Sequence, residues 1–136
     1  MTPEKLAELA MEAMHHAYAP YSGYKVGAAL LCKDGRVYQG CNIENASFTP
    51  TVCAERSAFF KAVYDGEREF EAIAVCGGKD GVLTGFFPPC GVCRQVMREF
   101  CRDDFLIHLV GENRSIETVT LTDLLPYSFS AQTHMQ

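Results

Sequence analysis

The alternation of apolar and polar positions predicts a chain in which helices and strands follow one another. Apolar side chains recur at helical spacing over residues 4–19, where Thr2 can cap the helix and Pro20 can end it. Further helices are predicted over 52–64, 91–101 and 120–125. The chain is therefore expected to build helices of ordinary length separated by extended segments.

Runs rich in Val, Ile, Ala and Leu fill the intervals and predict five strands, over 24–33, 36–42, 70–76, 105–110 and 116–119. The Asp34-Gly35 pair is a hairpin signal between the first two strands. Helical segments separate the second strand from the third and the third from the fourth, so both connections are predicted as parallel crossovers. The hairpin connections make the predicted sheet mixed, in an α/β fold.

Length and charge limit what the chain can be. Its 136 residues fit one domain spanning 1–136, with an exposed tail from about residue 128. The formal net charge of −5 argues against a nucleic-acid or anionic membrane partner. No apolar run approaches the ~20 residues of a membrane span, and the N-terminus lacks the basic and apolar stretches of a secretory signal. We therefore expect a cytoplasmic protein whose cysteines stay reduced.

Two of the seven cysteines form a C-x-x-C pattern. Cys90 and Cys93 fall on one predicted helical turn, where positions i and i+3 face the same way and both sulfurs can reach one ion. The pair alone is compatible with structural zinc, a redox pair or coincidence. Structural zinc usually needs a second pair, which the sequence lacks, and the pattern follows a glycine-rich loop rather than an early strand. Four of the other cysteines are predicted to be small buried side chains without a chemical role: Cys32, Cys41, Cys76 and Cys101.

Cys53 and Glu55 favour a catalytic metal. Cys53 stands at the start of the second predicted helix, so three thiolates could meet at helix N-termini, where backbone N–H groups favour negative charge. Three protein ligands leave one position for water, and zinc lowers the pKa of bound water to ~7. Glu55 is then placed to carry protons. Three thiolates and Zn²⁺ leave a formal charge of −1, and Arg56 is a stronger candidate than Arg94 to offset it.

The two motifs together resemble the signature of the zinc-dependent deaminases. Cys53-Ala54-Glu55-Arg56 and Pro89-Cys90-Gly91-Val92-Cys93 match its three-cysteine variant, as found in the small homotetrameric cytidine deaminases. The resemblance covers about residues 18–129 and includes the segments 27–30, 40–47, 93–95 and 124–126. It implies a three-layer α-β-α fold with a five-stranded mixed sheet, one zinc per chain, and a homotetramer with shared active sites.

The resemblance also implies a reaction. Cytidine and 2′-deoxycytidine would be hydrolysed to uridine and 2′-deoxyuridine with release of ammonia, in pyrimidine salvage. Zinc-bound hydroxide would attack the base while Glu55 shuttles protons. The alternatives are a deaminase of single-stranded nucleic acid, a deaminase of a blasticidin-type antibiotic nucleoside, and a non-catalytic zinc module. The acidic net charge argues against a nucleic-acid deaminase. The Asn42-Ile43-Glu44-Asn45 run favours ordinary nucleosides over a blasticidin-type substrate, and Glu55 argues against a non-catalytic zinc module.

By the same resemblance, five residues would bind the substrate. Asn42 and Glu44 correspond to the pair that holds the ribose hydroxyls, since an amide and a carboxylate together donate and accept. Tyr24, where the family often has Phe, would stack on the pyrimidine, and Ala54 would offer backbone groups to the base edge. Phe129 corresponds to an aromatic residue that enters a neighbouring subunit's site. Loop capping by the polar pair and core packing of Tyr24 remain alternative interpretations.

Overall fold

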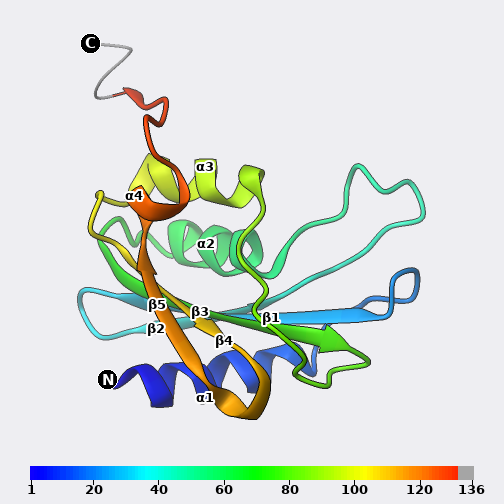
Figure 1. Ribbon diagram of the computed structural model, residues 1–136. Helices are drawn as coiled ribbons and strands as arrows, with labels where there is room; N and C mark the ends of the chain where they lie inside the picture. The colour runs from blue at the N-terminus through cyan, green and yellow to red at the C-terminus, as the bar shows by residue number, and fades with distance from the viewer. Residues whose placement is uncertain (132–136) are drawn as a thin grey trace.

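Five strands form one mixed sheet in the order β2-β1-β3-β4-β5 in the computed structural model, which describes residues 1–131 (Figure 1). The strands are β1 (Tyr24–Cys32), β2 (Val37–Cys41), β3 (Phe70–Lys79), β4 (Leu106–Val110) and β5 (Ile116–Thr120). β1 pairs antiparallel with both β2 and β3, β3 pairs parallel with β4, and β4 pairs antiparallel with β5. β2 and β3 therefore run in the same direction on either side of β1, which confirms both predicted crossovers.

The helices cover both faces of this sheet (Figure 1). They are α1 (Pro3–Met14), α2 (Ala54–Tyr64), α3 (Gly91–Phe100) and the short α4 (Leu121–Leu124), with a 3-10 turn, η1, over Glu112–Arg114. α1 packs on the face that carries Ala29 and Ala74, whereas α2 and α3 pack on the face that carries Ala28 and Val75. The predicted three-layer α-β-α arrangement is confirmed. None of the helices within residues 1–131 has the length and apolar character needed to cross a bilayer.

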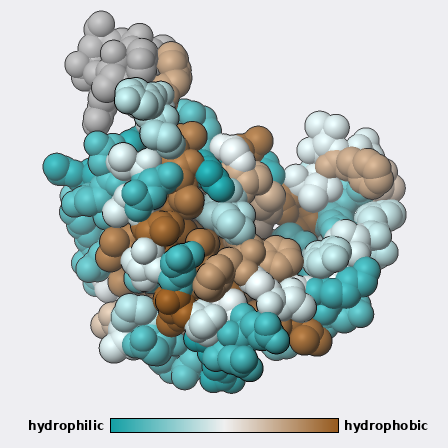
Figure 2. Space-filling view, in the orientation of Figure 1, coloured by the Kyte–Doolittle hydropathy of each residue, from teal (hydrophilic) through white to brown (hydrophobic). Residues whose placement is uncertain are grey.

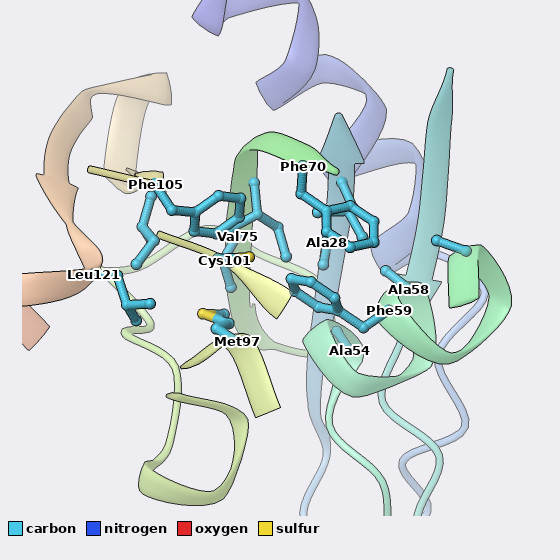
Figure 3. Packing of buried hydrophobic residues seen from close by; sticks show 14 of the residues in the cluster. Ala28, Ala54, Ala58, Phe59, Phe70, Val75, Met97, Cys101, Phe105 and Leu121 are labelled. Carbon is cyan, nitrogen blue, oxygen red and sulfur yellow. The ribbon is translucent and has the colours of Figure 1, made fainter. Parts of the chain in front are cut away.

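The larger core lies between the sheet and α2 with α3 (Figure 3). Phe59 of α2 is fully buried at its centre, and its ring lies 5.1 Å from that of Phe70 and 6.2 Å from that of Phe105. Met97 of α3 closes the same cluster. These contacts fix α2 and α3 against one sheet face, so their N-termini are held at fixed positions.

Gly40 lets α2 approach the sheet closely. A Cβ atom at this position would lie 2.4 Å from the carbonyl oxygen of Ala54 and 2.5 Å from the backbone nitrogen of Ala58. Real Cβ atoms do not approach backbone atoms so closely, so a larger residue would push the helix away from β2. The start of α2, where Cys53 is the capping residue, is thereby held against the end of β2.

Two predicted boundaries differ from the structure by three residues or more, and the others agree to within two residues. The first helix ends at Met14, not near residue 19, because the backbone of Tyr18 pairs with another segment: its N–H donates to Asn42 O at 3.0 Å. The third strand continues three residues past Cys76 to Lys79, because these residues pair with the start of β1. Both differences arise from long-range backbone pairing, which local periodicity does not report.

The remaining sequence predictions concern cysteines and the tail. Cys32, Cys76 and Cys101 are buried as predicted, whereas Cys41 is only half-buried. Phe129 lies in the described part of the predicted tail with 58% of its surface exposed, and its carbonyl oxygen accepts a hydrogen bond from Gln95 Nε2. Residues 132–136 of the predicted tail lie outside the described residues.

Candidate active site

Three sulfur atoms from two helix N-termini meet at one point. Cys53 is the N-cap residue of α2, Cys90 is the N-cap residue of α3, and Cys93 lies on the first turn of α3. Cys90 Sγ lies 3.7 Å from Cys53 Sγ and 3.5 Å from Cys93 Sγ. All three sulfurs lie within 4.8 Å of one another. Residues 37 positions apart are thus brought together by the fold.

The spacing of the sulfurs fits a zinc ion. Zinc–thiolate bonds of about 2.3 Å at tetrahedral angles place neighbouring sulfurs about 3.8 Å apart. The observed separations of 3.7 and 3.5 Å are close to this value. The side chains of Cys53 and Cys90 form no helix-cap hydrogen bond, so both sulfurs are available as ligands. Three sulfurs supply three of the four positions that zinc takes, and one is left for a non-protein ligand.

The electrostatics of the cluster favour a thiolate at Cys53. Hydrogen bonding with Cys93, and then with Arg56, lowers the pKa of Cys53 to about 5. The hydrogen bond with Cys53 in turn raises the pKa of Cys93, because one proton shared between two sulfurs is harder to remove. The positive end of each helix stabilises the negative charge further.

Arg56 supplies positive charge beside the sulfurs. Its Nη2 donates to Cys53 Sγ at 3.4 Å, and its Nε is buried with no hydrogen-bond partner among the described residues. A guanidinium at this place offsets the formal charge of −1 on three thiolates and Zn²⁺. Arg94 has a structural role instead. It donates hydrogen bonds to Pro89 O and to Leu124 O, both at 2.7 Å, and so connects the start of α3 to α4.

Glu55 is the second residue of α2 and is almost fully buried, with 4% of its surface exposed. The pKa of its carboxyl group is raised to about 7, chiefly by burial. A backbone hydrogen bond within the residue opposes this rise, the charge of Cys53 adds to it, and the charge of Arg56 opposes it. A carboxyl group with this pKa both accepts and releases a proton near neutral pH. The side chain therefore has the acid–base properties that a proton carrier beside the sulfurs requires.

Asn42 and Glu44 lie on the segment that follows β2, and their side chains are fixed by the chain around them. Asn42 Oδ1 accepts from the N–H of Val26, and Nδ2 donates to Tyr24 O, both at 2.8 Å. Glu44 Oε1 accepts from the N–H groups of Tyr21 and Ser22, at 2.9 and 3.1 Å. The amide of Asn42 keeps one N–H and one lone pair free for another partner.

A cavity of about 370 Å³ lies beside Glu44 and is lined by Tyr21, Ser22, Glu44, Phe48 and Thr51. Figure 2 shows that this face is hollowed next to the projecting loop that connects β2 to α2 (Figure 1). An antiparallel bridge pairs Ile43 with Val52, so Asn42 lies opposite Cys53 and Glu44 lies opposite Thr51. The bridge thus joins the segments that form the cavity wall to the residue Cys53, although none of the three cysteines is among the residues that line the cavity.

The other three residues predicted to bind substrate differ in their surroundings. Tyr24 is 46% exposed, its ring centroid lies 6.1 Å from that of Phe87, and Lys79 Nζ lies 5.2 Å from it. Ala54 is fully buried at the start of α2. Phe129 is not among the residues that line the cavity. No role was assigned to Lys79 or Ser22 from the sequence. The polar Ser-Gly turn directly before a strand is nevertheless a signal for a segment that could contact a binding site.

Such a site defines a zinc-dependent hydrolytic enzyme. A family model described as the cytidine and deoxycytidylate deaminase zinc-binding region matches residues 1–109. The chain belongs to this family, and the enzyme is a zinc-dependent deaminase.

Individual proteins agree with this assignment. The chain is 48% identical over 132 residues to a cytidine deaminase from Sporosarcina psychrophila, covering 97% of this chain and 94% of the relative. A crystal structure of cytidine deaminase from Burkholderia pseudomallei matches with a TM-score of 0.88 at 46% identity, covering 95% of this chain and all of that one. A blasticidin-S deaminase from Bacillus cereus is 29% identical over 130 residues, covering 93% of this chain and 91% of the relative.

Removal of Cys53 tests the ligand set. We expect Cys53→Ala to lose at least about 100-fold in zinc affinity, because only two of the three thiolates remain. Zinc content per chain after dialysis against a weak chelator measures this. Cys41→Ala, which removes a half-buried thiol away from the cluster, is the matched control and should retain one zinc per chain. A Cys53→Ala protein that also retains a full zinc would remove Cys53 from the ligands.

Proposed function

We propose that this chain hydrolyses cytidine and 2′-deoxycytidine to uridine and 2′-deoxyuridine, with release of ammonia. The observation that carries this proposal is a buried carboxyl group, Glu55, which interacts electrostatically with Cys53 and Cys93 of the three convergent sulfurs. Similarity to cytidine deaminases over nearly the whole chain supports the choice of nucleoside. The reaction recovers uracil nucleosides, so we infer a role in pyrimidine salvage by one domain that spans the chain. A cytoplasmic location would keep the ligand thiols reduced.

Zinc bound to Cys53, Cys90 and Cys93 would supply a water molecule that is readily deprotonated at neutral pH. Glu55 accepts the proton of the attacking water and passes it to N3 of cytosine, which makes C4 more electrophilic. The water oxygen adds to C4. Glu55 then takes the proton left on that oxygen and delivers it to the amino group, so that the C4–N bond breaks, the C4=O bond forms and ammonia leaves. The burial of Glu55 excludes bulk water that would otherwise compete for these protons. Arg56 offsets the negative charge of the thiolates while this happens.

Substrate binding would use Glu44 on the cavity wall together with residues that lie outside the cavity lining. Asn42 retains one amide N–H and Glu44 remains an acceptor, so together they can hold a ribose hydroxyl. The exposed ring of Tyr24 is free to stack on the pyrimidine. Ala54 carries one of the backbone N–H groups that every helix leaves unpaired at its N-terminus, and this donor suits the base edge. These contacts would position C4 and so supply effective molarity.

A blasticidin-type substrate is the second candidate because a blasticidin-S deaminase is among the relatives. Its lower identity, 29% against 48% for the Sporosarcina cytidine deaminase, favours ordinary nucleosides. The loss of ultraviolet absorbance that accompanies deamination distinguishes the substrates directly. We expect turnover of cytidine and deoxycytidine, and little of blasticidin S or of cytosine in an oligonucleotide.

Glu55→Gln tests the proton carrier. The amide has the same shape but cannot accept a proton, so we expect zinc content to be unchanged and kcat for cytidine to fall by at least about 100-fold. Glu99→Gln, on the exposed face of α3, makes the same chemical change outside the site and should retain full activity. Normal kcat in zinc-loaded Glu55→Gln would exclude Glu55 from proton transfer.

We also propose that the enzyme is a homotetramer in which Phe129 of one chain completes the active site of another. In the single chain Phe129 is 58% exposed, and Phe48 on the cavity wall is 71% exposed. Hydrophobic side chains also reach the surface elsewhere on this face (Figure 2). Exposed aromatic residues of this kind are typical of surfaces that a partner covers.

Complementation between two defective variants tests the shared site. Stacking contributes modestly, so we expect Phe129→Ala to lower kcat/KM for cytidine about tenfold. Refolding it together with Glu55→Gln should produce mixed tetramers in which some sites combine an intact Glu55 with an intact Phe129. Their activity should exceed the sum of the two variants refolded separately. Activity equal to that sum, in tetramers shown to be mixed, would mean that each site is built by one chain.

A further inference from the structure

The hydroxyl group of Ser22 lies between two residues that would bind the substrate. It donates to Glu44 Oε2 in a short hydrogen bond and accepts from the N–H of Tyr24 at 3.0 Å. We propose that Ser22 is a positioning residue, which aims the Glu44 carboxylate at the ribose 3′-hydroxyl and fixes the start of the strand that carries the stacking ring. This role presupposes the proposed nucleoside deaminase reaction.

Only one oxygen of Glu44 remains able to bind a sugar hydroxyl. Oε1 already accepts two backbone N–H groups, from Tyr21 at 2.9 Å and from Ser22 at 3.1 Å. Oε2 accepts only the Ser22 hydroxyl among the described residues, so it has a lone pair left for a ligand. The same hydrogen bonds with Ser22 lower the pKa of Glu44 and keep it an ionised acceptor. The oxygen that faces the substrate is therefore the one that Ser22 orients.

The turn that carries Ser22 is anchored on the sheet. Lys79 Nζ, at the end of β3, donates to Ser22 O at 3.1 Å, and the Asp80 N–H donates to Gly23 O at 2.7 Å. Gly23 adopts a φ of 75°, which only glycine adopts readily, and its N–H closes the turn on Ala19 O at 3.0 Å. Ser22 is thus a fixed support for Glu44, although its own side chain is exposed.

The position of this contact matches a binding role. Ser22 and Glu44 both line the cavity of about 370 Å³, together with Tyr21, Phe48 and Thr51. A hydrogen bond that only stabilised the fold would affect every substrate equally. A hydrogen bond that aims Glu44 should affect only substrates with a 3′-hydroxyl group.

The experiment compares cytidine with 3′-deoxycytidine, which lacks that hydroxyl, in the zinc-loaded full chain. We expect Ser22→Ala to lower kcat/KM for cytidine about tenfold, mainly through KM, because a hydrogen bond to a charged group is lost. The effect on 3′-deoxycytidine should stay within about twofold. Ser22→Thr keeps the hydroxyl and should restore the preference for cytidine. Ser115→Ala, which removes a hydroxyl bonded to Glu112 O in the β4–β5 turn, is the matched control and should change neither substrate.

The outcomes separate the two levels of the proposal. An equal loss on both substrates in Ser22→Ala, or no loss on either, would overturn the positioning role while leaving the deaminase function intact. Failure of the zinc-loaded wild-type chain to deaminate either nucleoside would instead overturn the proposed function, and the role of Ser22 with it.

Discussion

Three sulfur atoms must meet within 3.5 to 3.7 Å of their neighbours, and the rest of the structure is arranged around this requirement. Three adjacent thiolates repel one another unless positive charge is close. Here it comes from two helix N-termini, from the Arg56 guanidinium and from the bound cation. The two helices can begin together because each follows the carboxyl end of a strand, and β2 and β3 run in the same direction. Two crossovers of one sheet therefore place Cys53 and Cys90 at the same edge.

One helical turn then carries most of the chemistry. Cys53 caps α2, and the next three positions carry the helix N–H donor of Ala54, the buried carboxyl of Glu55 and the guanidinium of Arg56. In the proposed reaction, a metal ligand, a donor for the base edge, a proton carrier and a balancing charge are thus fixed by the placement of a single helix. Gly40 sets that placement, because it permits the close contact between β2 and α2. The cavity beside Glu44 is joined to the residues that precede α2 through the Ile43–Val52 bridge.

The features that could be predicted from the sequence are those encoded locally. Alternation of strand and helix patterns was sufficient for the mixed sheet and its crossovers. The zinc centre was predicted from the C-x-x-C pattern, from Cys53 and Glu55 at the start of another helix, and from the resemblance of both motifs to a known family. The predicted end of the first helix was wrong because the backbone of Tyr18 pairs with that of Asn42, a contact that depends on the whole fold. Ser22 was missed for a related reason. Its partner Glu44 is 22 positions away, and a single serine in a turn gives no periodic signal.

Zinc K-edge X-ray absorption on the zinc-loaded wild-type enzyme tests the central claim most directly, because it counts the atoms bound to the metal without any substitution. We expect three sulfur scatterers at about 2.3 Å and one oxygen scatterer at about 2.0 Å. That result would establish a three-thiolate centre with one position open to water. Four sulfur scatterers, or fewer than three, would contradict it, since the metal would then be either closed to water or bound by other residues.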